Sequence, residues 1–508
     1  MMMGTESIEK LEQDFLAYVK KIKAYEEALA LIYWDLRTGA PKKGVGQRAE
    51  VIGILSGEVF DMQTSKEMAE FLEKLLPHKQ QLPERTAGTL EECRKTYERS
   101  KKIPPDEYQA YTVLVSKAEN VWEEAKEKAD FSLFKPYLEQ IVAFKKKFVR
   151  YWGYEGHPYN PLLDLYEPGM TVDVLDRVFK QVKDAIVPLV QKISMSEEKP
   201  DTAFLFHPFP KEKQKAFTLE ILKQMGFDFE AGRLDETVHP FATGINQGDV
   251  RITTRYNEND WRVDVFGVMH EGGHALYEQH ISKDLSGTPL AEGASMGIHE
   301  SQSLFFENII GRSFPFWKKN YPLLKQFASG QFDDVPLEAF YRAVNEAKPS
   351  LIRIEADMLT YPLHIMVRYE IEKALLNDEI EIGDLPEIWN AKYEDYLGIR
   401  PAHDGEGVLQ DVHWAGGDFG YFPSYALGLM YAAQFKHAML KSLPDFDKLV
   451  ESGNLEPVRK WLTAHVHRFG KLKKPADILR DATGEALNPK YLIDYLTEKY
   501  TDVYRIKD

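Results

Sequence analysis

The segment from Val268 to His280, VMHEGGHALYEQH, carries two histidines four residues apart, with a glutamate directly after the first. Residues four apart on a helix are neighbours, so the imidazoles of His270 and His274 can bind one ion. Glu271 lies beside them, where its carboxylate can hold a water without displacing a ligand. This H-E-x-x-H arrangement predicts a zinc-type site that performs metal-assisted hydrolysis.

The surrounding sequence favours a buried helix at this motif. The flanking residues are apolar, namely Val265, Val268, Met269, Ala275 and Leu276. Histidines and a carboxylate on a buried helix need partners. Gly272 and Gly273 each cost a helix interior roughly 1 kcal/mol relative to alanine, which indicates that something approaches the backbone closely there. Two unrelated histidines on a solvated helical face are therefore the weaker interpretation.

A catalytic zinc has three protein ligands and an open position for water, so a third ligand is needed. We choose Glu300 in the segment IHESQS, because a helix there can fold back antiparallel beside the first one. Glu292, Glu307 and Asp264 are the competing candidates. In this scheme the metal polarises a carbonyl, and Glu271 is the general base that takes a proton from a water and delivers it to the leaving amine.

A tetrahedral intermediate needs donors beyond the metal. His413, Tyr421 and Tyr425 lie in the glycine-rich run HWAGGDFGYFPSY, which we expect to form a loop over the cleft. Packing in the core is the alternative role for Tyr421. His239, which precedes Pro240, could bind substrate, support the site or pack in the core.

Arg353 follows a break at KPS and precedes a helical pattern, so we expect it to project from the start of a helix into the cleft. A guanidinium is a planar, permanently charged partner for the free carboxylate of a peptide substrate. A salt bridge with Glu355, Asp357 or another acid of this acidic protein is the alternative role. Arg251 and Arg255, on a predicted strand, are alternative anchors.

Helical periodicity covers most of the chain, and it predicts a mainly α fold. Apolar residues recur at three- and four-residue steps in the ranges 7–23, 47–60, 107–128, 137–151, 175–186 and 298–311. Asp249–Tyr256 alternates apolar and polar residues instead, which predicts a small β-ribbon beside the cleft. An edge strand there could pair with an extended peptide, and a structural hairpin is the alternative. The sequence has no domain linker, so we expect one peptidase unit over residues 1–508, with two helical lobes around the cleft as one arrangement.

The composition is that of a soluble globular protein, with 508 residues, 44% of them hydrophobic and 28% charged. A formal net charge of -16 argues against nucleic acid or an anionic membrane as the main partner. The start lacks a signal pattern and no apolar run reaches ~18 residues, so a cytoplasmic location is expected. The single cysteine, Cys93, excludes an internal disulfide and a cysteine zinc site.

Six motifs together resemble those of the thermostable carboxypeptidase (carboxypeptidase Taq) family of metallocarboxypeptidases, over essentially the whole chain. They are HPF at 239–241, DVRIT at 249–253, HEGGH at 270–274, HESQ at 299–302, IRIEAD at 352–357 and GVLQDVHW at 407–414. The resemblance implies a nearly all-helical fold with a deep cleft and a cytoplasmic homodimer. It also implies release of C-terminal residues from peptides, with zinc or sometimes cobalt or manganese.

The resemblance also implies roles for single residues. His270, His274 and Glu300 are the metal ligands and Glu271 is the base, as chosen above, and Arg353 reads the substrate C-terminus. Similarity to related helical oligopeptidases favours Tyr425 as the oxyanion donor. Met358 departs from the acidic side chain expected in many relatives. An endo-acting oligopeptidase with the same chemistry and a non-catalytic peptide-binding scaffold are the alternative functions.

Overall fold

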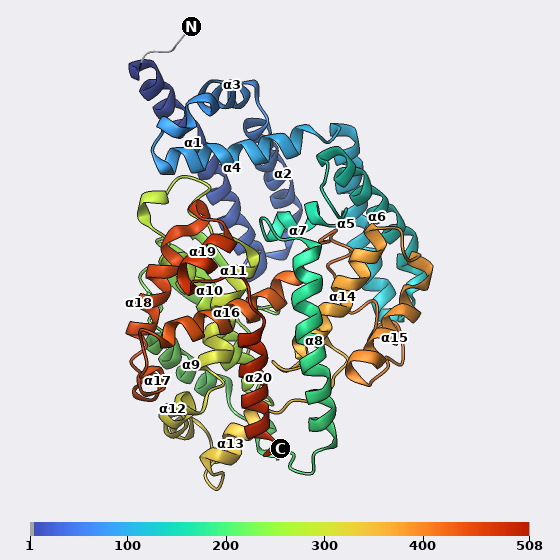
Figure 1. Cartoon of the computed structure of the whole chain (residues 1–508), viewed down its shortest axis with the longest axis vertical. Helices are drawn as coiled ribbons and strands as arrows, with labels where there is room; N and C mark the ends of the chain where they lie inside the picture. The colour runs from blue at the N-terminus through green and yellow to red at the C-terminus, as the bar shows by residue number, and fades with distance from the viewer. Residues whose placement is uncertain (1–4, 507–508) are drawn as a thin grey trace.

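The computed structural model describes residues 5–506, and most of them are helical, which confirms the expected fold class (Figure 1). The first helices are α1 (Thr5–Thr38), α2 (Val45–Gln63), α3 (Lys66–Leu75) and α4 (Glu84–Lys101), at the top of Figure 1. Their buried apolar residues, among them Phe15, Phe71 and Leu90, form a cluster of their own. The predicted helix at 7–23 is the first half of α1, which continues through Trp34.

The remaining helices surround one large apolar core that extends along the chain from Leu114 to Tyr504. On the right of Figure 1 lie α5 (Pro105–Lys128), α6 (Phe131–Trp152), α14 (Tyr361–Leu376) and α15 (Leu385–Leu397), with α7 (Asn160–Tyr166) and α8 (Val172–Met195) beside them. On the left lie α9 (Lys211–Met225), α10 (Arg262–Gln279), α11 (Met296–Leu304), α12 (Phe314–Phe327), α13 (Leu337–Val344), α16 (Pro423–Leu440), α17 (Phe446–Ser452), α18 (Glu456–His465), α19 (Pro475–Thr483) and α20 (Lys490–Val503). None of the described helices is long and apolar enough to cross a membrane.

The β structure is a three-stranded sheet rather than a single ribbon. Its strands are β1 (Gly232–Glu236), β2 (Ala242–Asn246) and β3 (Asp249–Thr254), in the order β1-β3-β2. β3 pairs in parallel with β1, as at Leu234 and Ile252, and antiparallel with β2. The predicted strand is therefore central, and the expectation that it offers a free edge is wrong, because both its edges are already paired. The outer strand that begins at the cleft is β2, whose first residue, Ala242, lines it.

The helix α10 lies deep in the molecule, where its apolar flanks predict it to be. It packs against α9, α11 and β3, and most of its residues are buried. The next helix, α11, packs against both α10 and α16. Ser295 caps α11 by accepting a hydrogen bond from the Ile298 backbone at 3.0 Å, which fixes where this short helix begins. The site is thus built on packed helices rather than on loops.

Candidate active site

The three predicted metal ligands come together on α10 and α11. One donor atom each from His270, His274 and Glu300 lies within 4.8 Å of the others. Glu300 Oε1 is 3.5 Å from His270 Nε2, and its Oε2 is 3.5 Å from His274 Nε2. Two imidazole nitrogens and one carboxylate oxygen are a donor set that suits zinc, so these residues fit the ion that the sequence predicts.

Close packing of helices positions Glu300 against the histidines. His270 faces Glu307 whereas His274, one turn later, faces His299, so α10 and α11 run antiparallel as expected. A Cβ added at Gly273 would lie 2.5 Å from the Gln302 carbonyl oxygen. On the other side of α11, a Cβ added to Gly428 of α16 would lie 2.8 Å from Glu300 Cβ.

Gly272 and Gly273 both permit the close approach that the sequence indicated, but to different neighbours. A Cβ at Gly272 would meet side-chain ends of α9, at 2.8 Å from Met225 Cε and 3.0 Å from Leu222 Cδ2. A Cβ at Gly273 would meet backbone atoms of α11. The second glycine therefore sets the distance between the two helices that carry the candidate metal ligands.

Each candidate metal histidine has a partner on its other ring nitrogen. Glu307 Oε2 lies 2.9 Å from His270 Nδ1, and Arg312 donates to the other oxygen of Glu307 at 3.2 Å. Glu307 belongs to a π-helical turn, Phe305–Ile310, that follows α11 directly. Burial lowers the pKa of His270, but the carboxylates of Glu300 and Glu307 raise it to about 10. A cation bound at His270 Nε2 would take the place of that proton.

His274 has a longer chain of partners. Its Nδ1 lies 2.7 Å from His299 Nδ1, and His299 Nε2 lies 2.6 Å from Glu278 Oε1. If His274 Nε2 faces an ion, its Nδ1 proton is donated to His299, whose own proton is then on Nε2 and is donated to Glu278. A single assignment of tautomers thus satisfies the whole chain.

Sequence reasoning missed Glu278 and His299, and it placed Glu307 only among the competing metal ligands. A signal existed, because Glu278 is four residues after His274 and so lies one turn further along the same face. Glu292 and Asp264, which also competed as ligands, have different partners. Glu292 pairs with Lys23 at 2.7 Å and with Lys471, and Asp264 accepts from Thr254 at 2.8 Å.

A cleft of about 1030 Å³ is lined by the three candidate metal ligands, and Glu271 lies in its wall. Only 8% of Glu271 is exposed, and burial raises its pKa to about 7, although the charge of His270 acts in the opposite direction. The segment His239–Ala242, which leads into the free-edged strand β2, also lines the cleft. The base candidate, the three candidate metal ligands and the first residue of the edge strand β2 therefore line one cavity.

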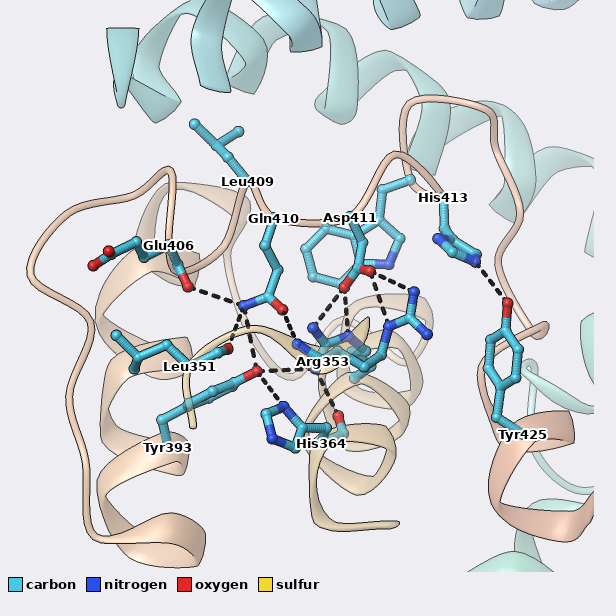
Figure 2. Close-up of polar contacts among 12 residues, drawn as sticks. Leu351, Arg353, His364, Tyr393, Glu406, Leu409, Gln410, Asp411, His413 and Tyr425 are labelled. Carbon is cyan, nitrogen blue, oxygen red and sulfur yellow. Dashed lines mark hydrogen bonds and ion pairs between the residues drawn. The ribbon is translucent and has the colours of Figure 1, made fainter. Parts of the chain in front are cut away.

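Arg353 lines the same cleft and is held by the segment Gln410–Asp411 (Figure 2). Its Nε and Nη2 donate to Asp411 Oδ1 at 2.9 and 2.8 Å, and its backbone N–H donates to Gln410 Oε1 at 2.9 Å. Its Nη1 donates to the Tyr361 hydroxyl at 3.0 Å. The salt bridge considered as an alternative is thus present, but its partner is Asp411, another acid distant in sequence, rather than Glu355 or Asp357.

The backbone around Arg353 also differs from expectation. Arg353–Glu355 form a short 3-10 turn, and the helix α14 begins only at Tyr361. Asp357 holds the turn that precedes this helix, accepting from the Leu359 and Thr360 backbone at 2.9 and 3.0 Å. Met358 is buried and lines the cleft, so an apolar side chain faces the cavity where many relatives are expected to carry an acid.

The tyrosines of the glycine-rich loop reach the cleft, whereas His413 lies behind them. Tyr421 and Tyr425 line the cavity, with ring centroids 5.2 Å apart. Tyr425 stands in the first turn of α16, and its hydroxyl is 3.5 Å from His413 Nε2 (Figure 2). Burial lowers the pKa of His413 to about 4, so its imidazole is neutral. His413 can therefore act on the cleft through the Tyr425 hydroxyl.

The two remaining predicted substrate residues differ in position. His239 is exposed and lines the cleft, so it is not a packing histidine. Arg251 is absent from the lining of the described cleft, because it pairs with Asp249 at 2.7 Å and lies over the Trp34 ring, 5.5 Å from its centroid. The structure therefore brings His239 to the site and leaves Arg251 on the outer side of the sheet.

The chain matches the family model described as Carboxypeptidase Taq (M32) metallopeptidase over residues 14–500. It is 58% identical to Carboxypeptidase 1 of Bacillus subtilis, over 98% of this chain and 99% of that protein. It is 41% identical to Thermostable carboxypeptidase 1 of Thermus thermophilus, over 97% of this chain and 98% of that protein. The solved structure of the M32 carboxypeptidase from Deinococcus radiodurans superposes with a TM-score of 0.94 at 33% identity, covering 98% of this chain and 100% of that chain.

Proposed function

Because the chain belongs to the carboxypeptidase Taq (M32) family and is a metallocarboxypeptidase, we propose that it removes C-terminal amino acids from peptides at a zinc site of His270, His274 and Glu300. The observation that carries the proposal is the convergence of their donor atoms within 4.8 Å beside the buried Glu271. A divalent ion on these ligands supplies polarisation of the scissile carbonyl and acidification of a water. Cobalt and manganese suit the same donors.

Glu271 acts as the general base in this proposal. It follows the first ligand in sequence and lines the cleft, so its carboxylate faces the space in which water and substrate meet. It takes a proton from the attacking water and delivers that proton to the leaving amine. The second ring nitrogen of His270 contacts Glu307, and that of His274 contacts His299. Glu271 has no such partner role in holding the histidines, so its carboxylate can accept and release a proton.

The substrate is bound by groups at both sides of the metal cluster. Arg353 binds the terminal carboxylate, because it is a buried guanidinium that lines the cleft. Tyr425 donates to the developing oxyanion, supported by His413 behind it, and Tyr421 lies beside it. His239 and the free edge of β2 contact the peptide upstream of the cleaved bond.

We further propose a cytoplasmic homodimer that acts on peptides and has neither nucleic acid nor a membrane as a partner. The formal net charge of -16 supports the absence of an anionic partner. The family resemblance supports the dimer and the location. The residues 1–508 form one peptidase unit in this proposal.

Paired peptides with a free or an amidated C-terminus test the proposal. With zinc bound, we expect mass spectrometry to show the loss of single C-terminal residues from the free-acid peptide. The otherwise identical peptide with an amidated C-terminus should change little. Arg353→Ala should cost a few kcal/mol in transition-state stabilisation on the free acid and much less on the amide. Equal cleavage of both peptides, or internal fragments from both, would replace this proposal with the endo-acting oligopeptidase.

A further inference from the structure

Asp411 is shared between two buried guanidinium groups. Arg353 occupies its Oδ1 through two donors at 2.9 and 2.8 Å (Figure 2). Arg368 of α14 donates from Nε to its Oδ2 at 2.6 Å. The exposed fractions of the Arg353, Arg368 and Asp411 side chains are 7%, 0% and 11%. The three groups therefore form a charge cluster largely removed from water, which lies at one wall of the cleft.

The cluster carries one net positive charge. Burial raises the pKa of Asp411, but the charges of Arg368 and Arg353 overcome this and hold it well below its usual range, so the carboxylate is ionised. Within residues 5–506, no other carboxylate accepts a hydrogen bond from either guanidinium. Arg368 otherwise donates to the His364 carbonyl at 2.8 Å and the Tyr393 hydroxyl at 3.2 Å, which are both neutral.

Arg353 keeps donors for a further anion. A guanidinium has five N–H groups. Asp411 takes the one on Nε and one on Nη2, and the Tyr361 hydroxyl takes one on Nη1. This leaves one N–H on each terminal nitrogen, the number that a bidentate carboxylate needs. Arg353 lines the cleft and Arg368 does not, so the anion can reach only the first of the two arginines.

We propose that Arg368 determines how strongly the enzyme binds the substrate's terminal carboxylate, although it does not touch the substrate. It does so by sharing Asp411, so that this carboxylate does not neutralise Arg353. Without Arg368 the wall of the cleft would carry a neutral Arg353–Asp411 pair, and an incoming carboxylate would be repelled by Asp411 as strongly as it is attracted by Arg353 at longer range. The inference rests on the proposed function, in which Arg353 binds that carboxylate.

Arg368→Met tests the inference, because methionine keeps the length and apolar packing of the side chain while removing its charge. We expect kcat/KM on free-acid peptides to fall roughly tenfold or more, through a higher KM at nearly unchanged kcat, since a full charge is lost within a low-dielectric site. The kcat/KM on the matched amidated peptides should change little, so the ratio of kcat/KM between the free-acid and the amidated peptide falls. Arg342→Met is the matched control, because Arg342 is half-buried and donates to the Val503 and Glu198 carbonyls far from the cleft.

A double variant separates charge from structure. Arg368→Met with Asp411→Asn restores one net positive charge, and the amide oxygen of asparagine can still accept from Arg353. We expect this double variant to recover most of the preference for free-acid over amidated peptides that Arg368→Met loses. If Arg368 only supported the local structure, adding Asp411→Asn would leave the free-acid to amide ratio of kcat/KM low or lower it further. That result would overturn the inference.

The outcomes remain distinct from those of the proposed function. If the parent enzyme does not distinguish free acid from amide, the carboxylate role of Arg353 fails. If the parent distinguishes them and Arg368→Met does so equally well, only the inference about Arg368 fails. Should Arg368→Met not fold, Arg368→Gln removes the same charge while keeping a donor for Tyr393, and the same loss of discrimination is expected.

Discussion

Gly273→Ala is the substitution that most directly tests how helix packing builds the metal site. The added Cβ would lie 2.5 Å from the Gln302 carbonyl oxygen and 2.6 Å from Ser303 Cα. Both are backbone atoms of α11, so no side chain can rotate away. Ordinary carbon contacts begin near 3.5 Å, so α10 and α11 must separate locally by roughly 1 Å.

The separation should weaken metal binding more than it weakens the fold. Glu300 lies less than one turn before Ser303, so it moves with that part of α11 away from both histidines. Overpacking costs about 1–3 kcal/mol, and alanine returns about 1 kcal/mol of helix propensity, which leaves a net loss of roughly 0–2 kcal/mol in unfolding free energy. Metal ligand distances tolerate only about 0.2 Å, so we expect metal affinity to fall at least roughly tenfold.

Gly272→Ala is the matched control on the same helix. Its Cβ would meet Met225 Cε at 2.8 Å and Leu222 Cδ2 at 3.0 Å, and both atoms are ends of flexible side chains. We expect zinc affinity like that of the parent and a stability that is unchanged or slightly higher. Competition with a chelator measures affinity, and thermal unfolding of the metal-free proteins measures stability. Equal zinc affinity of Gly273→Ala and Gly272→Ala would refute the argument that Gly273 sets the ligand distance.

The remaining predictions concern single carboxylates. Glu271→Gln should lose nearly all turnover while keeping near-stoichiometric zinc by metal analysis, and loss of the metal would contradict its role as the base. Glu300→Ala should release zinc at lower chelator concentrations than the parent, and unchanged retention would place the third ligand elsewhere. Burial raises the pKa of Glu167 to about 7, although it accepts hydrogen bonds from Tyr431 and the Gly297 backbone, so the folded state holds its proton more tightly than the unfolded chain. Its contribution to stability is therefore present below about pH 4.5 and is lost as the pH rises towards 7, and Glu167→Gln should remove this part of the pH dependence of the unfolding free energy.

The parts of the site that follow from local geometry could be predicted from the sequence. Helical spacing brings His270 and His274 together, and the adjacent glycines correctly indicate a close neighbour. The partner of Arg353 could not be predicted in this way. Asp411 lies 58 residues further along the chain, so its position depends on how α14 and the following loop pack. Charge attraction alone allowed any acid and pointed first to the nearer ones, but Asp357 accepts from the backbone of the turn before α14 and Glu355 is exposed.

The pairing of the strands in the sheet could not be predicted from the sequence either. The period-two pattern of β3 predicts a strand, although Thr253, on the face predicted to be polar, is fully buried. The pattern carries no information about which segments pair with the strand. Both partner strands, β1 and β2, are short and half-exposed, so their own alternation is weak. The outer strand that begins at the cleft is therefore β2, which no sequence pattern singled out.

The separate apolar cluster of α1–α4 affects which parts of the molecule unfold locally. These helices share few core residues with the rest, and polar contacts such as Lys23 with Glu292 at 2.7 Å and Arg85 with the Ser286 carbonyl at 2.9 Å connect the two parts. Regions with their own core exchange amide hydrogens as cooperative units of lower opening free energy. The amides of α1–α4 should therefore exchange with solvent as one class, while those of α10, α11 and α16 stay protected until global unfolding.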